Sequence, residues 1–246
     1  MIVLAQVSDL HLDGGERSTR RAEQVLAHLN GLTRPVDALL VTGDIADHGL
    51  PAEYRQARKL LEVSYPVFGC PGNHDRRAAY REDFLGEPPS DAPINRVERA
   101  AGAAFVLCDS TIPGEDPGLL ADETIAWLDQ ALAGTAGEPT FVVFHHPPVP
   151  LHQPYVDELR QQGEQRLAEV LARHRQVVGL LCGHAHTAAA TRFAGLPLLV
   201  APAVASTLML PWEAGDMVDL ERPPALAFHV LDDDRRLTTH YRVVPG

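Results

Sequence analysis

The chain has 246 residues, of which 45% are hydrophobic and 22% charged, a composition that is ordinary for a globular protein and excludes a disordered or fibrous one. Its 33 acidic residues outnumber the 21 basic ones, and the formal net charge of −12 argues against a nucleic-acid partner, which would require a basic face. The three cysteines are odd in number and widely spaced, so no disulfide framework is expected. Residues 1–5 lack the basic start of a secretory signal, and no apolar run reaches the ~18 residues of a membrane span. We therefore expect a cytoplasmic protein with no membrane segment.

Short apolar runs alternate with helical patterns over the first 187 residues, which is typical of a layered protein built from both strands and helices. Between the apolar runs, hydrophobic residues recur at the spacing of amphipathic helices. Buried strands are predicted at residues 2–7, 36–42, 65–70, 104–109, 140–144 and 177–182. Helices are predicted at residues 17–30, 51–61, 122–133 and 157–174.

After residue 187 the pattern changes to strands without helices. Strands are predicted at residues 191–193, 198–201, 225–231 and 238–244. The last two would form a closing hairpin over residues 225–246, because the three aspartates at 232–234 are a turn signal. Residues 203–224 have no clear period and are interpreted as a long loop, of the kind that can serve as a lid or a dimer element. Without an internal repeat or a linker, one domain over residues 1–246 is the simplest organisation.

Five groups of polar side chains each lie just past the end of a predicted strand. They are Asp9-Leu10-His11, Gly43-Asp44, Gly72-Asn73-His74-Asp75, His145-His146 and Gly183-His184-Ala185-His186. Each group alone could be a turn, a helix cap or a rigid loop exit. However, open sheets of this class bind ligands outside the carboxyl ends of their strands, so the five groups should converge at one edge. Taken together, they predict a functional site.

The residue types in these groups predict metal chemistry. Carboxylate and amide oxygens mixed with imidazole nitrogens, with no cysteine, suit Mn, Fe or Zn better than a thiolate zinc site. A carboxylate shared by two such ions holds them about 3.5–4 Å apart, the separation used for in-line displacement at phosphorus. Two divalent or mixed-valence ions would also supply the positive charge that an acidic chain lacks when it binds an anionic substrate.

The ordered set of motifs, spanning residues 9–186, resembles the calcineurin-like metallophosphoesterase family. The fold that this resemblance implies is α+β, a four-layer αββα sandwich of two mixed sheets flanked by helices. It implies that one metal is bound by Asp9, His11 and His186, that the other is bound by Asn73, His145 and His184, and that Asp44 bridges them. It also implies that His74 faces the phosphate as the acid for the leaving group or as a charge stabiliser, oriented by Asp75. His146 is the poorer ligand of its pair, since adjacent strand residues point to opposite faces.

Within the family, residues 43–49 followed by Glu53-Tyr54, together with the His-His-Pro-Pro sequence at 145–148, resemble the branch of class III cyclic-nucleotide phosphodiesterases and glycerophosphodiesterases. The resemblance implies a phosphodiesterase that uses a metal-bridging hydroxide for in-line attack. The preferred substrate is a 3′,5′-cyclic nucleotide, with cyclic AMP hydrolysed to AMP. A glycerophosphodiester, another small diester or a phosphomonoester remains an alternative. Some members of the branch carry polar residues after the segment that matches 200–203, whereas this chain has residues 204–207 as Val-Ala-Ser-Thr, so substrate contacts there are an open question.

Two other functions are less consistent with the sequence. A non-catalytic scaffold on the same fold has no reason to keep His74 beside seven candidate ligands. A repair nuclease would need more positive charge than an acidic chain with Lys59 as its one lysine provides. The expected partner is therefore a small phosphodiester, and the chain could be a monomer or a homodimer. Arg76 and Arg77 could meet a phosphate or begin a helix, and Trp212 could stack on a base or pack at a dimer interface.

Overall fold

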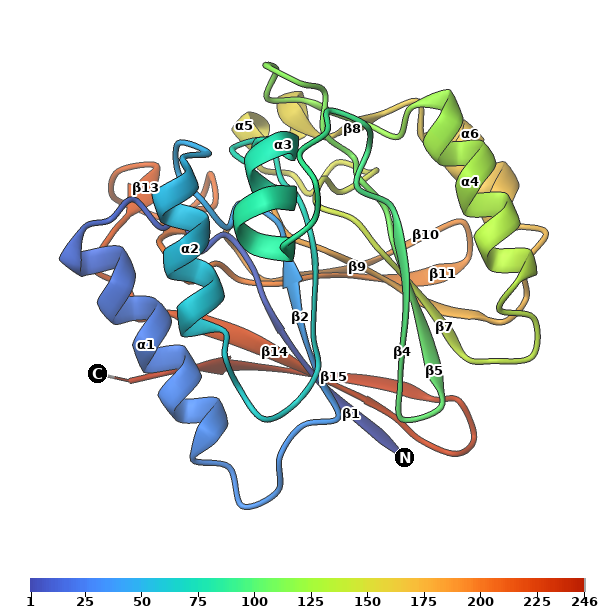
Figure 1. Ribbon diagram of the computed structural model, residues 1–246, viewed down its shortest axis with the longest axis horizontal. Coiled ribbons are helices and arrows are strands. Elements are labelled where there is room, and N and C mark those ends of the chain that lie inside the picture. The colour runs from blue at the N-terminus through green and yellow to red at the C-terminus, as the bar shows by residue number, and fades with distance from the viewer. Residues whose placement is uncertain (246) are drawn as a thin grey trace.

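A computed structural model describes residues 1–245 and places them in two mixed sheets (Figure 1). The first sheet has the order β15-β14-β1-β2-β3, and the second has the order β10-β11-β9-β7-β5-β4. In the first sheet, β1, β2 and β3 run parallel to one another, and β14 pairs antiparallel with both β1 and β15. In the second sheet, the edge strands β4 and β10 pair antiparallel with β5 and β11. The strands of the first sheet are β1 (Ile2–Val7), β2 (Ala38–Thr42), β3 (Val67–Cys70), β14 (Ala225–Leu231) and β15 (Leu237–Val243). Those of the second are β4 (Arg96–Ala100), β5 (Ala103–Leu107), β7 (Thr140–Val143), β9 (Val177–Cys182), β10 (Ala189–Phe193) and β11 (Leu196–Val200).

Helices cover the outer face of each sheet, which completes the four-layer sandwich that the family resemblance implies. In Figure 1, helices α1 (Glu16–Asn30) and α2 (Pro51–Leu60) lie on one side and helices α4 (Asp122–Ala133) and α6 (Glu164–Leu171) on the other. Helix α1 forms because its apolar residues recur on one face, and that face packs on the first sheet. The remaining helices are α3 (Arg77–Ala79), the π-helix η1 (Tyr80–Leu85) and α5 (Pro154–Leu159). Among residues 1–245, no helix has the length and apolar character needed to cross a bilayer.

One predicted helix was wrong, and one strand of the second sheet was missed. The helix predicted at residues 157–174 is divided into α5, the two-residue strand β8 (Gln161–Gln162) and α6, because Gly163 adopts a left-handed φ of 66° between them. Strand β8 pairs with the similarly short strand β6 (Gly118–Leu119). Strand β4 was not predicted, because its exposed edge position permits charged residues where a buried strand would be apolar.

The segment of residues 203–224 contains regular structure that its sequence does not suggest. Strands β12 (Thr207–Leu208) and β13 (Val218–Asp219) pair antiparallel within it. Further along, β14 and β15 form the predicted hairpin, which joins the first sheet through the pairing of β14 with β1.

The core between the two sheets consists of side chains from both of them. Phe105 and Phe141 stack in it with ring centroids 5.5 Å apart and an interplanar angle of 6°. We expect Phe141→Ala to lower the free energy of unfolding by about 3–5 kcal/mol, because a large cavity would remain in a closely packed layer. Urea denaturation of the metal-free chain measures this change. Val243→Ala is the control, since Val243 is 62% exposed. If Phe141→Ala lowers the free energy of unfolding by less than about 1 kcal/mol, the layer collapses around the cavity and the prediction is wrong.

Candidate functional site

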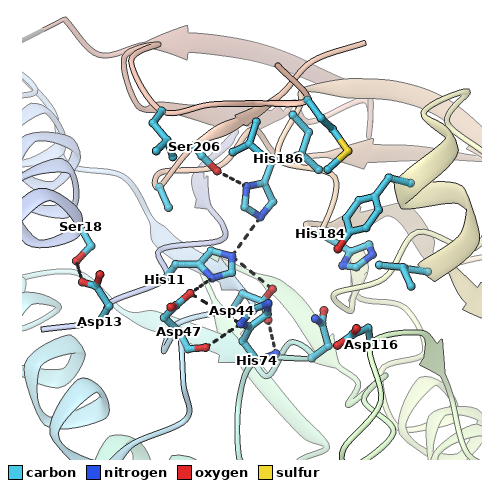
Figure 2. A pocket seen from close by; sticks show the side chains of 18 of the residues that line it. His11, Asp13, Ser18, Asp44, Asp47, His74, Asp116, His184, His186 and Ser206 are labelled. Carbon is cyan, nitrogen blue, oxygen red and sulfur yellow. Dashed lines mark hydrogen bonds and ion pairs between the residues drawn. The ribbon is translucent and has the colours of Figure 1, made fainter. Parts of the chain in front are cut away.

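The carboxyl ends of five strands from both sheets meet at one edge of the sandwich. Strands β1 and β2 lead into Asp9, His11 and Asp44, and β3 leads into Asn73. Strand β7 leads into His145, and β9 leads into His184 and His186. Figure 2 shows the labelled histidine and aspartate side chains of this set gathered around one cavity. The structure therefore brings together all seven of the predicted metal ligands.

One group consists of Asp9, His11 and His186, whose candidate ligand atoms all lie within 4.8 Å of one another. His186 Nε2 lies 3.5 Å from Asp9 Oδ1, and it lies 3.1 Å from His11 Nε2. Asp44 lies between this group and the next, because its Oδ2 is 3.6 Å from His11 Nε2 and 3.3 Å from His145 Nε2. Asp44 thus has the position that a bridging carboxylate requires.

The second group carries the observation that best tests whether these residues fit a metal. Asn73 Oδ1, His145 Nε2 and His184 Nε2 are buried atoms without a hydrogen-bond partner in residues 1–245. An unpaired buried polar atom costs about 1–3 kcal/mol, so three of them among the candidate ligands would be costly unless a cation binds there. In the neutral imidazole, His145 Nδ1 donates to the Thr42 carbonyl at 2.7 Å, which leaves the lone pair of Nε2 available to a cation. The donor set therefore fits a metal.

His146 lies beside this group but is engaged elsewhere. Its Nδ1 lies 2.8 Å from Ser110 Oγ, and its Nε2 donates to the Asp116 carbonyl at 3.1 Å. Burial and the neighbouring His145 lower the pKa of His146 to about 3. It is thus a neutral imidazole with both ring nitrogens already hydrogen-bonded.

The charges in the site stabilise one another. Burial opposes ionisation of Asp44, yet the imidazoles of His145 and His11 hold the pKa of its carboxyl well below the ordinary value. In turn, burial would lower the pKa of His145, but the charges of Asp44 and Asp9 raise it to about 9. The pKa of His184 is lowered by burial and by the neighbouring imidazoles, which favours the neutral form that can bind a metal.

The backbone of the site is unusual. Within residues 1–245, nine non-glycine residues have a positive φ, and five of them are candidate ligands. These five are Asp9, His11, Asp44, His184 and His186, with φ between 43° and 68°. A left-handed non-glycine residue costs about 1–3 kcal/mol, and such residues concentrate at functional sites. The site is therefore held in a conformation that its own residues do not favour.

Two glycines of the motifs are required by close approach rather than by turns alone. A Cβ at Gly43 would lie 2.3 Å from His145 Nδ1, and one at Gly183 would lie 1.9 Å from Ser8 Oγ. Any side chain at either position would displace a strand end that carries a candidate ligand. This explains why glycine precedes Asp44 and His184.

The predicted pair of His74 and Asp75 is arranged differently from the prediction. His74 Nδ1 donates to the Asp47 carbonyl at 2.8 Å, so a backbone atom orients the ring and not Asp75. Asp75 instead accepts hydrogen bonds from the Gly72 amide at 2.9 Å and the Tyr54 hydroxyl at 3.0 Å. The sequence prediction that Asp75 orients His74 was wrong, because Asp75 points into the protein and stabilises the loops that carry the ligands. Burial, followed by the charge of Asp44, raises the pKa of Asp75 to about 6.

Sequence reasoning missed three residues that position the candidate ligands. Asp47 Oδ1 accepts from His11 Nδ1 at 2.9 Å, and Ser206 Oγ lies 2.8 Å from His186 Nδ1. Tyr54 connects Asp75 to the backbone amide of Arg76 at 2.7 Å. Asp47 and Tyr54 belong to the stretch of sequence that resembles the family branch. That resemblance was the one signal in the sequence that could have pointed to them.

A cavity of about 510 Å³ opens onto the site. That volume falls within the range of about 300–1,000 Å³ typical of small-molecule sites. The polar residues that line it include His11, Asp44, Asn73, His74, His184 and His186. A substrate in the cavity would therefore contact both groups of candidate ligands and His74.

Asn73→Ala should weaken the response of the chain to metal ions. At a free Mn²⁺ concentration of about 100 Kd, each bound ion adds about 2.7 kcal/mol of stability, or roughly 5–10 °C in Tm for a chain of this size. The variant should lose about half of the shift that the wild type shows, since it lacks one ligand of the second group. Differential scanning calorimetry with and without Mn²⁺ measures this. Asn30→Ala, at the end of α1, is the matched control, and an unchanged shift in Asn73→Ala would rule Asn73 out as a ligand.

Comparison with known proteins places this site in context. A family model described as calcineurin-like phosphoesterase matches residues 2–188. The chain is 37% identical over 227 residues to a cAMP/cGMP dual specificity phosphodiesterase of Mycobacterium tuberculosis, covering 87% of this chain and 70% of that protein. It is 33% identical to the glycerophosphodiester phosphodiesterase GpdQ of Enterobacter lignolyticus, covering 82% and 77% of the two chains. The cyclic AMP phosphodiesterase CpdA of Pseudomonas aeruginosa is 30% identical, with 97% and 88% covered.

A solved structure supports the same fold. The dimetal phosphatase from Danio rerio superposes with a TM-score of 0.72 over 99% of this chain and 96% of that one. At 16% sequence identity, this likeness concerns the fold alone. It agrees with the two-sheet, four-layer arrangement described above.

Proposed function

The chain belongs to the calcineurin-like phosphoesterase family, and from that premise we propose that it is a metal-dependent phosphodiesterase whose preferred substrate is a 3′,5′-cyclic nucleotide, with cyclic AMP hydrolysed to AMP. The single observation that carries the proposal is the set of three unpartnered buried atoms on Asn73, His145 and His184, beside a carboxylate that lies between two histidines. Relatives named as cyclic-nucleotide phosphodiesterases support the choice of substrate. A relative named as a glycerophosphodiesterase makes glycerophosphodiesters the second candidate.

The proposal assigns the seven candidate ligands to two divalent cations. Asp9, His11 and His186 would hold one, and Asn73, His145 and His184 would hold the other, with Asp44 shared. When bound, such cations activate a water molecule and neutralise the negative charge of the phosphate. Mn, Fe and Zn all suit this mixture of nitrogen and oxygen ligands.

His74 would supply the proton in this mechanism. Because Nδ1 donates to the Asp47 carbonyl, the orientation of the ring is fixed and Nε2 remains free. The ring lies on the polar side of the cavity, with its centroid 4.6 Å from that of His11. In its protonated form, His74 Nε2 can donate to the alkoxide oxygen as the bond from phosphorus to that oxygen breaks. The oxygen of the attacking water forms the new bond to phosphorus, and the proton that this water loses passes to solvent. His11, held by Asp47, would keep its own Nε2 directed at the reacting centre.

The experiment that tests this proposal compares three substrates. Purified chain with added Mn²⁺ is given cyclic AMP, glycerophosphoethanolamine and bis(p-nitrophenyl) phosphate, each with and without chelator. Turnover of cyclic AMP that the chelator abolishes, at a kcat/KM above that for the glycerol ester, is the expected result. A higher kcat/KM for glycerophosphoethanolamine would favour the second candidate. Inactivity on all three esters, or turnover that resists the chelator, would overturn the proposal.

A further inference from the structure

We propose that the cavity has an apolar wall that binds the planar base of a nucleotide, and that this wall makes the chain prefer nucleotide esters to glycerol esters. The inference rests on the proposed function, because it concerns the organic part of the ester whose phosphate meets the metal ligands. Six side chains of the cavity lining form this wall. They are Tyr155, Leu159, Leu208, Met217, Val218 and Leu220.

Several residues of the wall expose apolar side chains to solvent. Residues 1–245 include eight exposed large hydrophobic side chains, and four of those eight are in the wall. Tyr155 is 48% exposed, Met217 is 49% exposed and Leu220 is 50% exposed. Single exposed apolar residues are ordinary, but a group of them in one concave place indicates a binding surface. This group shares a single cavity with the candidate metal ligands.

The segment that carries four of the six wall residues is anchored to the rest of the fold. Helix α1 holds both limbs of the segment 204–222 through two arginines. Arg17 donates to the carbonyls of Ala205, at 2.7 Å, and Leu220. Arg21, which is buried, donates to the carbonyl of Val204 at 2.7 Å and to that of Arg222 at 2.8 Å. Both ends of the segment that carries Leu208, Met217 and Val218 are therefore held to α1.

The same segment is also connected to the polar side of the cavity. The pairing of β12 with β13 sets Leu208 opposite Val218, and Ser206 Oγ lies 2.8 Å from His186 Nδ1. The wall and the candidate ligands are thus held at a set separation. An ester whose phosphate lies at the ligands would extend its organic group over the wall.

The chemistry of the wall selects the organic group. Five of its six side chains have no hydrogen-bonding group except the weak acceptor sulfur of Met217, and Tyr155 offers an aromatic face with a hydroxyl at its edge. A nucleobase can place its π-face against Tyr155 and the aliphatic side chains without regard to its identity. A glycerol group would instead place its hydroxyls against carbon, where they would lose hydrogen bonds to water and gain none. The wall therefore favours a flat base over glycerol, and it should bind adenine and guanine about equally.

The test separates the two substrates in matched variants. Tyr155→Ala should raise KM for cyclic AMP about tenfold and change kcat less than about twofold, because ground-state and transition-state binding of the base are lost together. KM for glycerophosphoethanolamine should change less than about twofold, and Tyr155→Phe should restore the wild-type KM for cyclic AMP. Met217→Ser should act in the same direction as Tyr155→Ala. Trp212→Ala is the control, since this aromatic residue of the same segment is 71% exposed and does not line the cavity.

A second measurement keeps this inference distinct from the proposed function. Saturation-transfer NMR with adenosine, which has no phosphate, reports contact between the base and the metal-free chain. We expect transfer to the adenine protons in the wild type and its loss in Tyr155→Ala. If the chain hydrolyses no diester yet binds adenosine in this way, the proposed function fails and the base-binding wall stands. If Tyr155→Ala leaves KM for cyclic AMP unchanged, or raises KM equally for both esters, the wall does not recognise the base and the inference is overturned.

Discussion

Replacing Asp44 by asparagine is expected to lower kcat for phosphodiester hydrolysis by about 10²–10⁴-fold, since bound ions contribute several kcal/mol to the transition state. Asp44 Oδ2 lies 3.3 Å from His145 Nε2 and 3.6 Å from His11 Nε2, so one carboxylate serves both groups of ligands. The amide of asparagine keeps the size of the side chain and an oxygen that can accept from the His74 amide, which now donates to Asp44 Oδ1 at 2.9 Å. The fold should therefore survive while the shared negative charge is lost.

The measurement combines kcat in Mn²⁺ with metal content by mass spectrometry. Asp44→Asn should retain fewer than two ions for each chain after dialysis. Asp83→Asn is the matched control, because it makes the same chemical change at a carboxylate that pairs with Arg55 away from the site. If Asp44→Asn retains two ions and has wild-type turnover, Asp44 is not a ligand of the metal centre.

His74→Ala is expected to separate proton donation from metal binding. The variant should keep both metals, because the orphaned buried atoms belong to other residues. Its kcat for cyclic AMP should fall by about 10²–10⁴-fold, since an alkoxide leaving group needs a proton. The loss should be much smaller for bis(p-nitrophenyl) phosphate, whose leaving group is stable as an anion. His240→Ala, on the exposed face of β15, is the matched control.

The leaving-group series decides between the two roles considered for His74. A loss that grows with the pKa of the leaving group identifies a proton donor. An equal loss across the series would instead assign His74 to stabilising charge on the phosphate. Loss of metal in His74→Ala would identify His74 as a metal ligand and contradict both of these roles.

Much of the fold could be predicted because its strands are buried on both faces. Strands such as β2 and β9 form continuous apolar runs, and helix α1 has a regular amphipathic period. Elements with weaker patterns were missed or extended. Strand β4 lies at an edge and carries charge, and the helix predicted at residues 157–174 ignores the left-handed Gly163. Local pattern cannot reveal these features, because they depend on what lies beside the segment.

The site was predictable in outline for a different reason. Parallel strands present their carboxyl ends at one edge, so motifs that follow Val7, Thr42 and Cys182 had to converge there. Convergence gives the neighbourhood of a residue but not the direction of its side chain. This is why the partner of Asp75 was predicted wrongly, while Asp47 was not considered as a partner of His74.

The apolar wall could not be predicted from the sequence. Tyr155 and Leu159 come from α5, whereas Met217 and Leu220 come from a segment without any clear period. They meet because Arg17 and Arg21 hold that segment against α1, and arginines that donate to carbonyls leave no pattern in the sequence. Hydrogen bonds from a side chain to a distant backbone therefore hold part of the wall that we propose to bind the base.

The left-handed backbone at five candidate ligands implies a trade between stability and activity. At a φ of 43°, His11 lies in the left-handed region of backbone conformation, where glycine is unstrained. A residue with a side chain in this region destabilises the folded chain by about 1–3 kcal/mol. The same holds at Asp9, Asp44, His184 and His186. Glycine at these places would relieve the strain, but it would also remove the side chains that are the candidate ligands. The strained positions therefore coincide with the residue types that the proposed metal centre requires, as expected where backbone strain is kept for function.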